Sequence, residues 1–207
     1  MSVESEIQAL RDEVQSLRAE VDRLSAIEAV KRVKHKYWRC FDTADLSGMA
    51  EVLHEDVHLS IEAGIYSMAY EGRDAYVQMV KDGAHADMIS HHNGHHAEID
   101  IVSDDEAIGT WYLYDDLYEF RRGMRLFGTA FYRDRYVRVD GAWKIRYSQF
   151  HRIYEIREAL RERPDITYHY LATHGHKHEG EVDLAPYPKD TGYRHPPGKM
   201  PPFLDTK

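Results

Sequence analysis

The sequence predicts an α+β domain in which a curved antiparallel sheet wraps around helices. Two observations predict it: segments with helical periodicity dominate the first part of the chain, and long strand-like segments joined by short turns follow one another in the second part. Helices followed by a run of hairpin-linked strands are typical of α+β domains. With 207 residues, of which 43% are hydrophobic, the chain can bury one substantial core.

The first predicted helix carries a heptad seam. Its apolar positions alternate in spacings of three and four, at Ile7, Leu10, Val14, Leu17, Val21 and Leu24. The phase slips at Ser25 and Ala26, where a second helix begins with the stripe Ile27, Val30, Val33, Tyr37 and Phe41. We therefore expect an N-terminal heptad helix (1–26), a domain proper (27–160) and a C-terminal arm (161–207).

The remaining elements follow in order. The second helix ends near Asp42, and a short helix (46–53), a strand (57–61), a connection containing Gly64 and a helix opening near Arg73 come next. Strands are expected at about 97–103, 106–120, 125–138 and 143–154, with hairpin turns at 103–105, 121–123 and 140–141. We expect these strands to pair in consecutive antiparallel order.

The arm begins beyond Arg163 and Pro164. Its prolines stand at 186, 188, 196, 197, 201 and 202, and it has little apolar periodicity. It is expected to have no core of its own, and either to be disordered or to lie on another subunit.

Charge and cysteine content exclude several classes of protein. The net charge of −9, from 27 basic and 36 acidic residues, argues against nucleic acid or an anionic membrane as the main partner. Cys40 is the only cysteine, and the start of the chain lacks the features of a signal peptide, so a cytoplasmic location is expected. No apolar run approaches the roughly 18 residues of a membrane span.

Titratable side chains gather between residues 90 and 116. The histidines of this stretch are His91, His92, His95 and His96, around Asn93 and Gly94, and an aromatic run at 110–114 ends in Asp115 and Asp116. A histidine at the mouth of a half-buried sheet titrates near neutral pH, as a general acid or base must. A polar loop is the plainer interpretation of the same residues.

Four motifs in this order resemble the SnoaL-like branch of the NTF2-like superfamily over about residues 25–155. They are Tyr37-x4-Asp42, the His91-His92 element, the strand GTWYLYDD and the last strand WKIRYSQFHRIYE. The resemblance implies a cystatin-like α+β cone around a pocket. It also implies a dehydratase, dehydrohalogenase, isomerase or cyclase that acts without metal or organic cofactor.

The resemblance also implies a set of catalytic residues. Carried over by position, they are Tyr37, Asp42, His92, Asp115 and Arg152, although the extra residue Asn93 leaves His91 open as the imidazole. Asp42 would orient the imidazole, and Tyr37 would donate a hydrogen bond to the substrate.

The last acidic and basic members of the set have two interpretations. Asp115 would serve as a second acid or base, with Arg152 holding a developing oxyanion, or the two would form a buried ion pair. For substrate contact we expect His91, Trp111, Tyr112 and Tyr114. Fifteen tyrosines in the chain suit a pocket for a phenolic ligand, although strand positions account for most of them.

The predicted function is a cofactor-independent lyase that acts on an aromatic alcohol. Diarylpropane lyases of lignin catabolism, which release formaldehyde from a diol, resemble this domain and are the narrower prediction. Alternatives are a dehydratase or isomerase of a steroid-like or polyketide substrate, and a non-catalytic ligand-binding or assembly module.

Metal binding and assembly complete the predictions. His174, His176 and His178 alternate as zinc ligands can, but their spacing matches no closed zinc site, so no metal is expected. We expect a homo-oligomer. The resemblance favours a trimer, whereas the heptad residues favour two strands.

Overall fold

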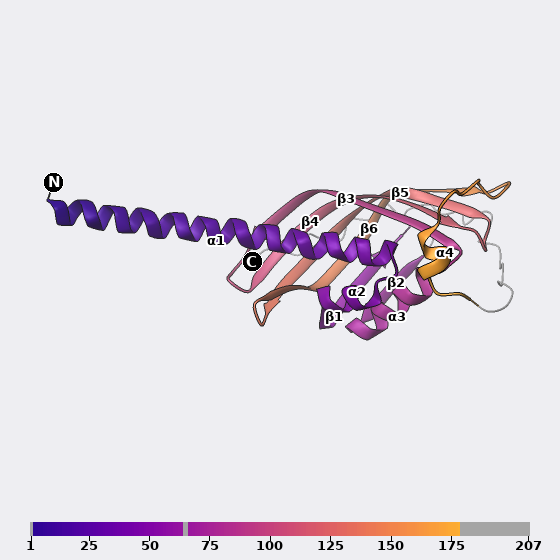
Figure 1. Ribbon diagram of the computed structural model, residues 1–207, viewed down its shortest axis with the longest axis horizontal. Coiled ribbons are helices and arrows are strands. Elements are labelled where there is room, and N and C mark those ends of the chain that lie inside the picture. The colour runs from indigo at the N-terminus through magenta and orange to yellow at the C-terminus, as the bar shows by residue number, and fades with distance from the viewer. Residues whose placement is uncertain (1, 64–65, 179–207) are drawn as a thin grey trace.

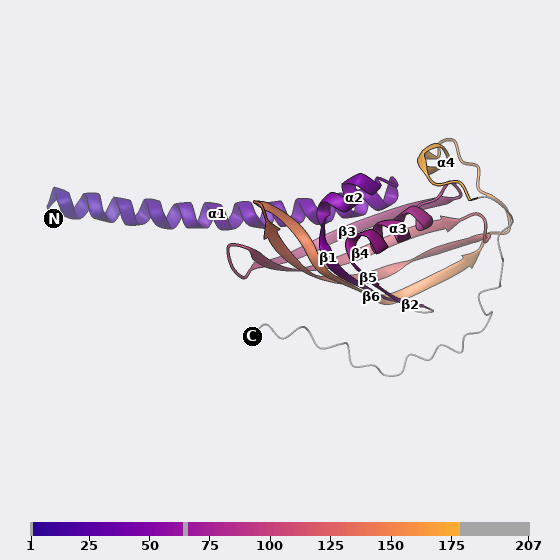
Figure 2. The ribbon, with the colours of Figure 1, turned by 90° about the horizontal axis from the view of Figure 1, so that it is seen from below.

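The computed structural model describes residues 2–63 and 66–178, which form a curved six-stranded sheet with helices on one side (Figures 1 and 2). The helices are α1 (Val3–Asp42), α2 (Leu46–Val52), α3 (Arg73–Gly83) and α4 (Tyr170–His174). The strands are β1 (Leu53–Glu62), β2 (Ser67–Glu71), β3 (Met88–Ile101), β4 (Glu106–Glu119), β5 (Met124–Val139) and β6 (Ala142–Ala159). The predicted α+β class is confirmed.

The last four strands form the predicted meander, and their turns explain why. Asp140 and Gly141 both have positive φ values, 50° and 80°, which is the conformation that a two-residue hairpin loop requires. Gly123 has a φ of 58° in the preceding turn. β3 to β6 pair in consecutive antiparallel order, as predicted.

One interface of the sheet corrects the expectation of purely antiparallel pairing. The strand order is β2-β1-β6-β5-β4-β3, and β1 pairs with β6 in parallel. The chain crosses over through α3 from the β1–β2 hairpin to the far edge of the sheet, and the meander then leads back toward β1. β2 had no counterpart in the sequence prediction, because its five residues are exposed or half-buried and carry no apolar alternation.

α1 is one continuous helix of 40 residues, so the predicted break at Ser25 and Ala26 is wrong. A change in the spacing of apolar residues that involves no glycine or proline leaves the backbone hydrogen bonds of the helix intact. It changes only which face of the helix is apolar. Beyond the slip, Val30, Tyr37 and Trp38 are buried against the sheet. The core of the domain lies between this half of α1 and the strands.

β3 begins nine residues earlier than predicted and includes the whole histidine stretch. Gly94 lies in this strand directly beneath Trp38 of α1. A Cβ atom built on Gly94 would lie 1.9 Å from the nearest atom of the Trp38 ring. Glycine is therefore required here for close packing of helix on strand, and the alternative interpretation of the histidines as a polar loop is wrong.

We expect Gly94→Ala to lower the free energy of unfolding by about 1–3 kcal/mol, the usual cost of forcing atoms into a packed core. Chemical denaturation measures this change. Gly83→Ala is the matched control, because a Cβ there meets its nearest neighbour at an ordinary 3.6 Å. Equal stability of the two variants would show that Trp38 does not pack on Gly94 as described.

The described part of the arm packs on its own chain. Leu171 of α4 is buried, and His176 forms a parallel bridge with His85. The expectation of disorder is therefore wrong for this part, and docking on another subunit stays a prediction. The prolines from 186 onward lie outside the described residues. No helix within those residues combines the length and the apolar character needed to cross a bilayer.

Candidate active site

An imidazole–carboxylate pair lies where the end of α1 meets β3. Nδ1 of His92 lies 2.7 Å from Oδ1 of Asp42, and the backbone N–H of His92 donates to Oδ2 at 3.0 Å. The hydroxyl of Ser90 donates to Oδ1 at 2.8 Å. The carboxylate is thus fixed by three contacts, and it fixes the imidazole in turn.

This arrangement leaves Nε2 of His92 free for proton transfer. A carboxylate on Nδ1 favours the tautomer with its proton there, so that Nε2 presents a lone pair. The His92 side chain is 11% exposed and lines a cavity. The ring of Phe41 packs edge-on against it, with centroids 4.9 Å apart.

His91 is not in an equivalent position. Its side chain is exposed on the outer face of the sheet, and its neighbour in the register of β3 and β4 is Asp116. β3 contains a bulge between His95 and Glu98, where His96 has a φ of 52°, so the bulge lies beyond His92 and leaves the alternation of His91 and His92 intact. The register of β3 therefore turns His92 inward and His91 outward.

The cavity has a volume of about 190 Å³ and lies between α1, α3 and the sheet. Four of the five predicted catalytic residues line it, namely Tyr37, His92, Asp115 and Arg152. The fifth, Asp42, contacts His92. Much of the remaining wall is methionine, leucine, isoleucine and phenylalanine, so polar groups converge in an otherwise apolar space.

Asp115 and Arg152 form a buried ion pair at the cavity wall. Nη1 of Arg152 donates to Oδ1 of Asp115 at 2.6 Å, and Nε donates to Glu155 at 3.1 Å. Burial disfavours the guanidinium charge, but the hydrogen bond and charge of Asp115 outweigh it and raise the pKa of Arg152. Arg152 is thus a cation held between two carboxylates and facing the cavity.

Three tyrosines converge beside this pair. The hydroxyls of Tyr37 and Tyr76 are hydrogen-bonded, and the ring of Tyr132 meets Tyr37 edge-on at a centroid distance of 6.2 Å. Burial, reinforced by the other two tyrosines, raises the pKa of Tyr37 well above its ordinary value. Tyr37 therefore stays protonated and can donate a hydrogen bond to a ligand oxygen. The sequence prediction missed Tyr76 and Tyr132.

A buried lysine that sequence reasoning also missed lies beneath the tyrosines. Nζ of Lys34 lies 2.9 Å from Oδ2 of Asp134, and both side chains are fully buried. The same nitrogen lies 3.6 Å from the ring centroid of Tyr132 and 4.4 Å from that of Tyr37. Ser148 donates to Asp134 at 2.6 Å. A lysine three residues before Tyr37, on the helix face that enters the core, was the available signal.

Lys34 is expected to make stability rise with pH between about pH 8 and 9. Burial, partly offset by Asp134, lowers the pKa of Lys34 from 10.5 to about 8. Below pH 8 both the folded and the unfolded lysine are protonated. Above it only the unfolded lysine keeps its proton, so the free energy of unfolding increases, by about 1 kcal/mol over this unit.

The rise in the free energy of unfolding ends near pH 9, because groups whose pKa is raised by folding lower this free energy at higher pH. Burial raises the pKa of Cys40 from 9.0 to about 11, so this thiol lowers stability as pH rises above about 9. Urea unfolding at pH 8 and pH 9 measures the rise. The rise should vanish in Lys34→Met/Asp134→Asn, which removes both charges together. If the free energy of unfolding of this variant rises as much as that of the wild type, the rise is caused by groups other than Lys34.

The residues predicted for substrate contact are not in the cavity. On β4 the alternating residues Trp111, Leu113 and Asp115 are buried, so Tyr112 and Tyr114 lie on the opposite, outer face of the sheet, as His91 does. Trp111 points inward but packs in the core, where its Nε1 donates to Tyr136 at 3.0 Å. None of the four predicted contact residues therefore lines this cavity, and their contact with a substrate stays a prediction.

A wider outer chamber of about 540 Å³ adjoins the cavity. The two share Tyr66, Met68, Met88 and Leu117 as lining residues. The rim of the chamber is polar and includes His85, whose Nε2 lies in hydrogen-bond contact with Oε2 of Glu119 at 2.8 Å. His92 and Arg152 line the cavity and not the chamber.

Comparison with known proteins identifies the family. The model of the SnoaL-like domain matches residues 22–149. Among solved structures, a putative scytalone dehydratase from Novosphingobium aromaticivorans is 21% identical, with a TM-score of 0.61, covering 72% of this chain and 99% of that one. For the type 3 hexachlorocyclohexane dehydrochlorinase from Novosphingobium barchaimii the values are 20%, 0.60, 70% and 99%.

A third structure, ActVI-ORFA from Streptomyces coelicolor, is 19% identical, with a TM-score of 0.51, covering 62% of this chain and 98% of that one. At these identities the likenesses show a shared fold, which is the α+β cone expected from the sequence. The family match covers the helix that carries Tyr37 and Asp42 and the strands that carry His92 and Asp115. The chain belongs to the SnoaL-like family of the NTF2-like superfamily.

Proposed function

We propose that this protein is a cofactor-independent lyase that acts on a phenolic alcohol by acid/base elimination. Its substrate is a diarylpropane diol of the kind derived from lignin, and it releases formaldehyde. The observation that carries the proposal is the His92–Asp42 pair, which presents a free imidazole nitrogen to a cavity lined by tyrosines. Dehydratase and dehydrochlorinase names among the structural neighbours are consistent with elimination chemistry.

The chemistry needs a proton donor, a proton acceptor and a site for negative charge. The 4-hydroxyl of the substrate ring gives its proton to water, and its electrons expel the benzylic hydroxyl, which leaves as water with a proton donated by the His92 imidazolium. The product of this step is a quinone methide. Arg152 and Tyr37, which both line the cavity, would stabilise the phenolic oxygen.

In the second step His92 accepts the proton of the terminal hydroxyl. The O–H electrons form the carbonyl of formaldehyde, the carbon–carbon bond breaks, and its electrons form the stilbene double bond and restore the aromatic ring as a phenolate. The phenolate takes back a proton from water, and His92 is again the imidazolium. The diol thus becomes a stilbene, formaldehyde and water, with no net oxidation or reduction. Asp115 accepts a hydrogen bond from Arg152, so we assign both proton transfers to His92 and a positioning role to Asp115.

The size of the site favours a substrate with two rings. The inner cavity of about 190 Å³ is smaller than usual ligand pockets of about 300–1,000 Å³. Together with the outer chamber of about 540 Å³ it accommodates a longer molecule. One ring would lie between His92 and Arg152, and the second ring would lie among Met68, Met88 and Leu117.

A screen of phenolic alcohols tests the proposal, with stilbene absorbance and free formaldehyde as the two readouts. The proposal expects both products together from a diarylpropane diol. Loss of water without formaldehyde would favour a dehydratase instead. No turnover across the screen would favour a binding or assembly module, although a His92 paired with Asp42 beside an open cavity supports an enzyme.

Methylating the substrate phenol is expected to suppress turnover far more than binding. The methyl ether cannot form the phenolate that expels the benzylic hydroxyl, whereas the cavity wall contacts both compounds similarly. Initial rates and inhibition constants of the two compounds measure the difference. Turnover of the ether at the rate of the free phenol would exclude the quinone methide mechanism.

A further inference from the structure

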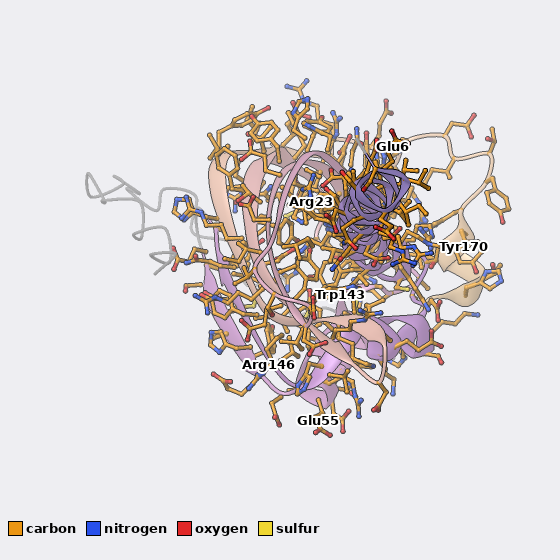
Figure 3. The ribbon with its side chains drawn as sticks, turned by 90° about the vertical axis from the view of Figure 1, so that its left-hand side faces the viewer. Glu6, Arg23, Glu55, Trp143, Arg146 and Tyr170 are labelled. Atoms are coloured by element: carbon orange, nitrogen blue, oxygen red, sulfur yellow. The ribbon has the colours of Figure 1, made fainter. Side chains whose placement is uncertain are left out.

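The N-terminal half of α1 projects away from the domain (Figures 1 and 2). Every residue from 2 to 25 is exposed. Figure 3, which looks along the helix from its N-terminal side, labels Glu6 and Arg23 on this segment. Most helical stability in proteins comes from packing of an apolar face, and the described residues provide no such packing for this segment.

One stripe of this segment is apolar over its whole length. Its members are between 44% and 71% exposed, namely Val3, Ile7, Leu10, Val14, Leu17, Val21 and Leu24. Isoleucine and valine occupy one seam position (a), and leucine occupies the other (d) from Leu10 onward. This combination favours two parallel strands. Within the domain, α1 uses another face, because Val30, Lys34 and Tyr37 fall on other heptad positions.

The charges beside the stripe specify how a second helix would lie. The position before each a residue (g) is glutamate at 6, 13 and 20, and the position after d (e) is arginine at 11 and 18. In a parallel, in-register pair, g of one helix faces e of the next heptad of the other. Glu6 would then face Arg11 of the second copy, and Glu13 would face Arg18. An antiparallel pair would instead bring glutamate against glutamate and arginine against arginine.

These four side chains are available for such contacts. In the described part of α1 before the domain, the ion pair within the helix joins Glu20 and Arg23. Glu6, Glu13, Arg11 and Arg18 make no ion pair among the described residues. Opposite charges on both sides of an exposed apolar seam are the pattern that selects the partner and its orientation in coiled coils.

We propose that residues 3–24 form a parallel, in-register, two-stranded coiled coil with the same segment of a second copy of this chain. The assembly places the two domains at the same end of the coil, each with its own cavity. It is independent of the proposed reaction, since none of these residues lies near His92.

Disulfide trapping tests the geometry. In the parallel coil, Leu10 of one chain faces Leu10 of the other, so Leu10→Cys is expected to give a disulfide-linked dimer under mild oxidation. Ala19→Cys is the matched control, because position 19 points away from the seam. The native Cys40 is 2% exposed and lies within the domain. In an antiparallel pair the a positions face the d positions, so with residues 7–24 aligned Leu10 would face Val21 of the other chain and Leu10→Cys would give little disulfide. Equal yields from both variants would overturn the proposal.

Charge exchange tests the pairing rule in the same background. Glu6→Arg/Glu13→Arg makes all four side chains of the two predicted g–e pairs basic, and Arg11→Glu/Arg18→Glu makes all four acidic. Each protein alone is expected to lose most of its disulfide, and an equimolar mixture should recover it as a mixed dimer. Light scattering of the wild type should give the mass of two 24.2 kDa chains. Unchanged trapping in either variant alone, or a mass of one or three chains, would overturn the proposal.

Discussion

His92→Ala is expected to lower kcat by about a hundredfold or more, the usual effect of losing a positioned proton-transfer group. His92 contributes the imidazole that lines the cavity, and Asp42 fixes that ring at 2.7 Å. Alanine leaves a space that water can enter but that holds no group of suitable basicity. Initial rates of stilbene formation at saturating substrate measure the loss.

His91→Ala is the matched control for this result. It removes the same side chain from the preceding position of the same strand, but from the exposed outer face. Its kcat should stay close to that of the wild type. If the His91 variant is inactive while the His92 variant works, the assignment of His92 as the inward imidazole is wrong.

Asp42→Asn is expected to lower kcat by a similar factor of about a hundred, because the carboxylate orients His92 and stabilises the imidazolium that forms during proton transfer. An amide keeps the shape of the side chain but carries no charge, and it can donate to Nδ1 and so favour the wrong tautomer. Circular dichroism should accompany the kinetics, since Asp42 also accepts from Ser90 and from the backbone of His92.

Asp116→Asn provides the control for a lost carboxylate. Asp116 lies on β4 and pairs with Arg125 at 2.7 Å, on the face of the sheet opposite to the cavity. The variant should keep kcat and lose some stability at most. Equal losses of activity in the two variants would point to a general effect of charge or folding rather than to orientation of His92.

The meander of the sheet could be predicted because its turns are local. Asp140 and Gly141 adopt the positive φ values of a tight hairpin, and that pair of residue types signals such a turn in any sequence. The end of α1 at Asp42 was equally accessible. The order of the motifs that resemble the SnoaL-like family predicted that Tyr37, His92, Asp115 and Arg152 share one site. All four line the same cavity.

Long-range pairing and the facing of strands were harder to predict. The parallel contact of β1 with β6 joins residues about 90 positions apart, and no local pattern encodes it. On β4, large aromatic side chains occupy both faces, with Trp111 inside and Tyr112 and Tyr114 outside. Hydrophobic alternation therefore could not decide which aromatic residues face the cavity.

Buried charges were hidden for a related reason. Lys34 and Asp134 belong to residue types that are almost always exposed, so sequence reasoning placed neither in the core. Both side chains are nevertheless fully buried, each as the partner of the other. The clue was positional: Lys34 continues the inward stripe of Val30 and Tyr37, and Asp134 lies between Tyr132 and Tyr136 on the inward face of β5.

The measurement that tests the account most directly is kcat of the double variant His92→Ala/Asp42→Asn beside both single variants. Asp42 is assigned no proton transfer of its own and acts only through His92. The double variant should therefore be about as active as His92→Ala alone, because residues that act as one unit show strongly non-additive effects. If the losses instead multiply, so that the double variant falls about a further hundredfold below His92→Ala, Asp42 acts independently of His92 and the proposed acid/base pair is contradicted.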